Sequence, residues 1–303
     1  MSNLSNERKE YKVGMICAIV AMIVWGLAPM YWRALLPIDS FVIIAYRIIF
    51  AGIVCGVASL CVYGKAEMKK SLGDKKNAGL LFFAGFLITI NWSVYIYGVN
   101  SGQTIGATIG YYITPLLVSI AGIFLFKERL TKYKFIAITL AFIGVFSMII
   151  YFGRLPAITL TLAISFAMYA VIKKHLKMKA IISLFYETII FAVLAIGYLV
   201  YMEATGQGAL HIAEPYQIVM LAFSGFLTAV PLAMFSMAAN RLTLVSVGVM
   251  QYLGPSIGIA VGFFVFREPF FLGQLIACIL IWIGLMFFTY GEIKLTRELR
   301  RSN

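Results

Sequence analysis

The sequence predicts an all-α integral membrane protein of ten transmembrane helices, arranged as two inverted five-helix repeats. Three observations predict this fold class: an apolar composition, ten apolar runs of membrane-spanning length, and similarity between the two halves of the chain. Of the 303 residues, 62% are hydrophobic and only 12% are charged, whereas a soluble domain carries about 25% charged residues. The lipid bilayer is therefore the first partner that the composition implies.

The ten runs follow from the thickness of the bilayer, which a helix of about 20 mostly apolar residues can cross. Their connections are short, so we expect no extramembrane domain. The predicted spans are residues 13–33, 40–63, 78–99, 103–126, 133–152, 156–173, 180–201, 217–239, 244–266 and 270–290.

Lysine and arginine residues orient the chain. If the N-terminus is cytoplasmic, 21 of the 25 lie in inside segments, three lie outside, and Arg47 remains within a span. Because cytoplasmic loops carry an excess of these residues, the split predicts that both termini are cytoplasmic. The same excess explains the net charge of +13, so we expect no nucleic-acid partner.

A shift of 140 residues aligns the two halves without a gap. The matched positions include Gly85 with Gly225, Tyr112-x-x-Pro115 with Tyr252-x-x-Pro255, Glu128 with Glu268, Ala137 with Ala277, and Gly144 with Gly284. Because each half has five helices, an odd number, the second half must enter the membrane from the opposite side. Inverted halves suit alternating access, in which one central site opens to either face.

The predicted division of the chain follows from this repeat. We expect a cytoplasmic tail at residues 1–12, a first five-helix repeat at 13–152, a second and inverted repeat at 156–291, and a basic cytoplasmic tail at 292–303.

Two charged residues are predicted deep within spans, Arg47 and Glu187, and they are related by the same shift of 140. A charge near the bilayer centre costs about 2.5–3.5 kcal/mol on insertion scales and usually faces the interior of the bundle. We therefore expect both near the midplane, facing one central cavity, where they either pair directly or share a polar substrate. A purely structural ion pair between residues 40–63 and 180–201 is the alternative.

Each charge suggests its own chemistry. Arg47 could clamp a carboxylate or phosphate through its planar fork. Glu187 could hold an amine, and it is the buried carboxylate available to carry a proton if transport is coupled to protons.

Further candidates for the site are polar or aromatic residues within spans. For the amides, hydrogen bonding between helices is the alternative, and for the rings it is a place in the interfacial belt. The predicted substrate-binding residues are Trp25, Arg47, Asn91, Trp92, Tyr112, Glu187, Gln251 and Tyr252.

Motifs of other protein classes are missing from the sequence. No GxxxxGK[ST] loop marks ATP as an energy source, and no HExxH motif occurs. The four cysteines form no CxxC pair, so neither a metal site nor a disulfide framework is suggested. We expect no cofactor, no metal and no enzymatic activity.

Several motifs occur in order along nearly the whole chain. They are Trp25-Gly26-x-x-Pro29, Tyr46-Arg47, Asn91-Trp92, Gly110-Tyr111-Tyr112-x-x-Pro115, Glu128-Arg129, Glu187-Thr188, Gln251-Tyr252-x-Gly254-Pro255 and Glu268. This set resembles the RarD-type permeases of the EamA family, in the drug/metabolite transporter superfamily. One departure is Phe166-Ala167, where EamA repeats often place Trp before a small residue.

The resemblance implies a ten-helix carrier in the plasma (inner) membrane of a prokaryote, with a central cavity and an often exported small-molecule substrate. We expect a secondary transporter, and in particular an exporter of small metabolites or drugs, that works by alternating access. Uniport and proton antiport are both open, as is the oligomeric state. The rival class is a membrane ligand-binding sensor or regulatory subunit without net transport.

Overall fold

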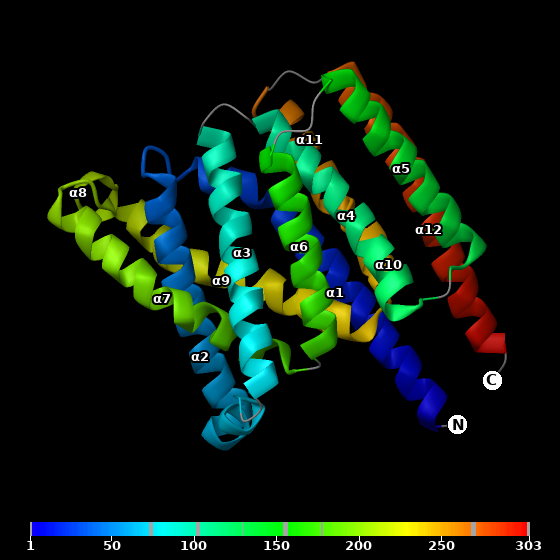
Figure 1. The fold of residues 1–303 in the computed structure, drawn as a ribbon, viewed down its shortest axis with the longest axis horizontal. Helices are drawn as coiled ribbons and strands as arrows, with labels where there is room; N and C mark the ends of the chain where they lie inside the picture. Colours follow the sequence, from blue (N-terminus) through cyan, green and yellow to red (C-terminus); the bar gives the residue numbers. More distant parts are fainter. Residues whose placement is uncertain are drawn as a thin grey trace.

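The computed structural model describes residues 2–72, 75–100, 104–128, 130–153, 157–176, 178–267 and 271–301, and Glu268 lies outside this part. Every regular element in the described part is a helix, which confirms the all-α class. The helices are α1 (Ser2–Arg33), α2 (Ser40–Leu72), α3 (Lys75–Asn100), α4 (Thr104–Phe126), α5 (Lys132–Phe152), α6 (Ala157–Leu176), α7 (Ala180–Ala204), α8 (Ala209–Ile212), α9 (Pro215–Arg241), α10 (Leu244–Met250), α11 (Leu253–Ala260), a π-helix (Val261–Val265) and α12 (Leu272–Arg301) (Figure 1).

Eight segments of the described chain are long and apolar enough to cross a membrane. Two further apolar helices, Gly110–Phe126 and Leu275–Gly291, are shorter. Together these ten segments overlap the ten predicted runs. The eight longer segments are Lys9–Arg33, Ser40–Leu72, Asn77–Tyr95, Lys132–Tyr151, Ala157–Leu176, Ala180–Ala204, Pro215–Arg241 and Leu244–Val265.

The run predicted as one helix at 244–266 is divided in the structure. A turn at Gln251 and Tyr252 separates α10 from α11, and a π-helix follows α11. Pro255 has no N–H to donate to the carbonyl of Gln251, and its ring crowds that carbonyl. The proline therefore accounts for the break four residues before it.

Two helices extend beyond the predicted spans. α1 begins at Ser2, so the predicted N-terminal tail is helical. α2 continues to Leu72 through Gly64, whose φ of 73° and ψ of 164° are not helical. Glycine adopts a positive φ at little cost because it has no Cβ, and the chain bends there.

The main packing contacts join helices from the two halves of the chain. α5 lies along α12, α2 along α7, α1 along α9, and α3 along α6. The α5–α12 pair is visible at one edge of the bundle (Figure 1). The two chain ends lie at the same end of the bundle, and the end of α2 and the start of α3 lie there as well (Figure 1).

Glycines allow two further helix pairs that join the halves, α3 with α7 and α2 with α9, to approach closely. A Cβ added to Gly85 of α3 would lie 2.4 Å from the carbonyl oxygen of Glu187 in α7. A Cβ added to Gly225 of α9 would lie 2.5 Å from the carbonyl carbon of Phe50 in α2. Real Cβ atoms do not tolerate such distances, so any larger residue at either position would push the helices apart.

Glu128, which follows α4, caps the start of α10. Its Oε1 accepts a hydrogen bond from Leu244 N–H at 2.7 Å, and its Oε2 accepts one from Val245 N–H at 2.9 Å. These N–H groups have no partner within the helix, and a carboxylate complements the positive end of the helix dipole. Glu128 thereby ties the end of α4 to the start of α10.

We expect Gly85→Ala to lower the stability of the protein by about 1–3 kcal/mol, the usual cost of overpacking. Gly197→Ala is the matched control. Gly197 lies within α7 at an exposed position, and no atom lies within 4 Å of its added Cβ. The control should be neutral or stabilising by up to about 1 kcal/mol. Thermal unfolding of the two variants in detergent measures the difference, and equal melting temperatures would contradict the close packing of α3 on α7.

Candidate substrate-binding site

Arg47 projects from α2 into a group of aromatic side chains. Its Nε donates a hydrogen bond to Thr228 Oγ1 of α9 at 3.1 Å. Its guanidinium carbon lies 4.2 Å from the ring centroid of Trp32 and 4.8 Å from that of Trp92. An aromatic face stabilises a cation by about 0.5–2 kcal/mol. We call Trp32, Arg47, Trp92 and Thr228 the Arg47 box.

Tyrosines complete the surroundings of this box. Tyr31, Tyr95 and Tyr111 lie near the guanidinium. The rings of Tyr95 and Tyr111 also contact each other, with centroids 5.2 Å apart. Within the part of the chain that the structure describes, no carboxylate forms an ion pair with Arg47. The positive charge is held by aromatic faces and one hydroxyl.

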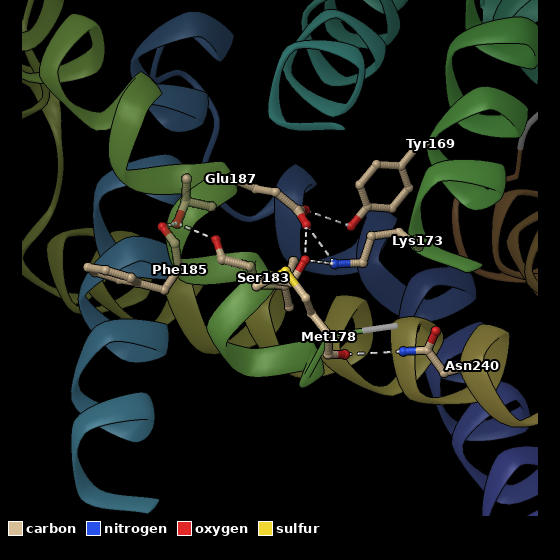
Figure 2. A network of polar contacts seen from close by, with 9 residues as sticks. Tyr169, Lys173, Met178, Ser183, Phe185, Glu187 and Asn240 are labelled. Atoms are coloured by element: carbon tan, nitrogen blue, oxygen red, sulfur yellow. Dashed lines mark hydrogen bonds and ion pairs between the residues drawn. The ribbon is translucent and has the colours of Figure 1, made fainter. Parts of the chain in front are cut away.

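Glu187 of α7 has a different kind of environment. Its Oε1 lies 2.6 Å from Lys173 Nζ of α6, and the side chains are 0% and 1% exposed. Ser183 accepts a hydrogen bond from Lys173 at 2.7 Å and donates one to Glu187. Tyr169 donates its hydroxyl to Glu187 Oε2 at 3.1 Å, as Figure 2 shows. We call these four residues the Lys173–Glu187 network.

The position of Lys173 corrects the sequence analysis, in which this residue ends the predicted span 156–173 and is counted among the 21 basic residues of the inside segments. α6 continues to Leu176, so Lys173 is one turn inside the helix and its side chain is buried. A buried ammonium group is tolerated only with compensating partners, and here Glu187 and Ser183 supply them. A third charge therefore lies within the spans, beside Arg47 and Glu187.

The direct pair considered between Arg47 and Glu187 does not form in this structure, because Glu187 pairs with Lys173. A Cβ on Gly52 of α2 would lie 3.4 Å from Thr188 Oγ1, and one on Gly56 would lie 3.0 Å from the Phe185 ring. α2 and α7 are thus antiparallel, and Glu187 is level with residues near Gly52. At 1.5 Å per residue, this position lies about 7.5 Å along the α2 axis from Arg47.

Asn91 and Trp25 both serve contacts between helices. Asn91 of α3 donates through Nδ2 to Leu162 O at 2.9 Å and to Ser165 Oγ at 3.0 Å, both on α6. The amide therefore makes contacts between helices, of the kind considered as the alternative to a place in the substrate site. Trp25 of α1 packs against Phe166 and Phe235, with ring centroids 5.8 and 5.7 Å apart.

The remaining predicted residues meet where α4 faces α10 and α11. The rings of Tyr112 and Tyr252 contact each other at a centroid distance of 6.3 Å. Tyr112 shares a hydrogen bond of 3.0 Å with the thiol of Cys278. Gln251 Nε2 and Tyr252 OH are buried and have no hydrogen-bond partner among the described residues. Such groups are costly unless something satisfies them.

The structure thus places seven of the eight predicted residues in three neighbourhoods, and the eighth, Asn91, bonds α3 to α6. Arg47 and Trp92 share the Arg47 box, and Tyr112 lies with Gln251 and Tyr252. Trp25 and Glu187 are linked through Phe166 and Tyr169, whose rings contact each other at 5.8 Å. The described residues contain no group of three or more His, Cys, Asp or Glu residues that could hold a metal ion.

Sequence reasoning missed five residues that touch the predicted charges: Trp32 and Thr228 beside Arg47, and Tyr169, Lys173 and Ser183 beside Glu187. Lys173 carried a usable signal, since it lies four residues after Tyr169 and so shares its helix face. Thr228 and Trp32 carried none, because nothing local relates them to Arg47.

Known proteins share both the sequence and the fold of this chain. The EamA-like transporter family matches residues 12–150. An uncharacterized transporter of Bacillus subtilis, YojE, is 35% identical over 96% of this chain and 98% of its own length. Protein RarD of Streptomyces exfoliatus is 33% identical over 96% of this chain and 92% of its own length.

Protein RarD of Escherichia coli is 28% identical over 96% of this chain and 99% of its own length. One crystal structure superposes with a TM-score of 0.71, covers 90% of this chain and 96% of its own, and is 15% identical. At that identity the superposition supports the fold alone.

Helix composition, fold and relatives together define a class, the multi-pass membrane transporters of prokaryotes that carry drugs or metabolites. Within that class, the chain belongs to the EamA-like transporter family, as a RarD-type permease.

We expect Lys173→Met and Glu187→Gln each to destabilise the protein, by about 3–5 kcal/mol where a buried charge is left unpaired. The double variant Lys173→Met/Glu187→Met should recover most of this loss, because it removes both charges. Melting temperatures in detergent measure the effect.

Lys179→Met is the control, because Lys179 forms an exposed ion pair with Glu67 at 3.1 Å. An exposed pair contributes at most about 1 kcal/mol. If the Lys173→Met variant had the same melting temperature as the control, the buried pair would not stabilise the fold.

Proposed function

We propose that this permease is a secondary transporter that moves a small molecule by alternating access between two inverted five-helix repeats, residues 13–152 and 156–291. Ten transmembrane helices, both termini in the cytoplasm and net export of the substrate belong to the proposal. The observation that carries it is reciprocal packing: a contact between the halves recurs with each residue replaced by the one 140 positions away.

The reciprocal packing is clearest between α5 and α12. A Cβ added to Gly144 would lie 3.0 Å from Ala277 O, and one added to Gly284 would lie 3.1 Å from Ala137 O. Each partner of the first contact is replaced in the second by its equivalent from the other half. Such an exchange of roles is expected of a two-fold axis that relates the halves.

Two other contacts support the same axis. Gly85 approaches α7 and its equivalent Gly225 approaches α2, so these close contacts are also exchanged. Tyr112 and Tyr252 are equivalent to each other and are in contact, as residues beside such an axis must be. The location of both chain ends at one end of the bundle (Figure 1) fits an even number of crossings.

The charged positions differ between the halves in a way that suits a carrier. Arg47 is only partly buried, whereas its equivalent Glu187 is 1% exposed and fully bonded. In an inverted-repeat carrier, a conformation open to one side gives equivalent residues unequal access to solvent. We propose that the eight predicted residues, from Trp25 to Tyr252, contribute to the substrate site.

A direct test is uptake into proteoliposomes of a ligand identified by thermal stabilisation. The expected result is saturable uptake that falls at least tenfold in Arg47→Ala. Empty liposomes and the Lys179→Met variant are the controls. Binding without uptake in the parent protein would refute transport and favour a ligand-binding sensor.

Proton coupling, if present, should depend on Glu187, because it is the buried carboxylate of the network. We expect a pH gradient to drive accumulation by the parent and not by Glu187→Gln, which would still exchange substrate down its gradient. Accumulation that persists in Glu187→Gln would show that another group carries the protons. Uptake by the parent that does not depend on the pH gradient would indicate uniport.

A further inference from the structure

The charges of Lys173, Glu187 and Arg47 do not cancel, and the net charge that remains indicates which substrate charge the site can balance. Lys173 and Glu187 neutralise each other at 2.6 Å, so the Lys173–Glu187 network offers no net charge to a ligand. Arg47 has no carboxylate partner among the described residues. The helices around the site therefore hold one uncompensated positive charge.

The hydrogen bonds of Arg47 leave part of its guanidinium available. Nε is used by Thr228 Oγ1, and the two Nη groups have no acceptor among the described residues. The rings of Trp32 and Trp92 lie against the guanidinium carbon. Arg47 is only partly buried, and its Nη atoms are not among the fully buried polar atoms that lack a partner, so an incoming molecule can reach them. Two N–H groups side by side match the two oxygens of a carboxylate.

We infer that the Arg47 box binds the carboxylate of a small organic monoanion, and that the protein selects such acids over organic cations and neutral amides. The inference rests on the proposed transport function and names its substrate class.

Two alternatives fit the charges less well. An amine would have to displace Lys173 from Glu187, a contact that Ser183 and Tyr169 also support. A dianionic phosphate would carry one negative charge more than Arg47 can balance, and a leftover charge in a membrane interior is costly. A monoanion leaves the site neutral.

The test is a thermal-stability titration of the purified full-length protein in detergent at constant ionic strength. The probes share carbon skeletons: acetate with acetamide, and benzoate with benzamide and benzylamine, with sulfate added as an inorganic dianion. A ligand that binds the folded state raises the melting temperature. We expect acetate and benzoate to raise it by a few degrees, and the amides, the amine and sulfate to leave it unchanged.

Two variants locate the effect. Arg47→Met should lose the response to carboxylates, and without ligand it should melt at or above the parent temperature, because it removes a charge that no carboxylate of the described residues balances. Arg33→Met is the matched control, since the guanidinium carbon of Arg33 also lies 4.2 Å from a ring centroid, that of Phe266, but on an exposed side chain. The control should keep the full response.

Four outcomes would each overturn the inference. The carboxylates could give no shift, or the same shift as their amides. Benzylamine or sulfate could give a shift, or Arg47→Met could respond as the parent does. Transport is scored separately in proteoliposomes. Flux of an organic cation that survives Arg47→Met would refute the anion site and leave the transporter intact. Carboxylate binding at Arg47 without flux would support the anion site and refute transport.

Discussion

A charge inside a bilayer needs a partner, and this constraint organises the middle of the protein. Glu187 meets it within the protein, through Lys173, Ser183 and Tyr169. Arg47 meets it only in part, through two indole rings and one hydroxyl. The first arrangement is complete and joins α6 to α7. The second is incomplete in charge, and so it is the place where a ligand would change the energy of the protein most.

The close approach of helices depends on residues without side chains. Lipid provides no hydrophobic force that pushes helices together, so packing in membranes relies on small residues that bring backbones into contact. Gly85, Gly144, Gly225 and Gly284 each lie against the backbone of a helix from the other half. The halves are therefore in contact along several glycine faces, where the backbones of two helices meet with no glycine side chain between them.

These two features have complementary roles in the proposed mechanism. In that mechanism, one half moves against the other along the glycine contacts. The buried polar groups mark the positions at which the two halves differ. Gln251 and Tyr252 belong to this second set, because they lie at the break before α11 with buried polar atoms that lack partners in the described chain. A break of this kind in a spanning segment is typical of carrier sites.

Much of the fold was predictable from the sequence, because the thickness of the bilayer sets the length of an apolar run and a run is a local property. The all-α membrane class, the family and the placement of Arg47 and Glu187 within spans all follow from local patterns or from spacing. Their partners do not. Lys173 ends a predicted span and was counted with the inside segments, whereas α6 continues past it and buries its side chain, and Thr228 lies 181 positions from Arg47. Which side chains meet is decided by the rotation and axial offset of packed helices, and only the tertiary structure contains that information.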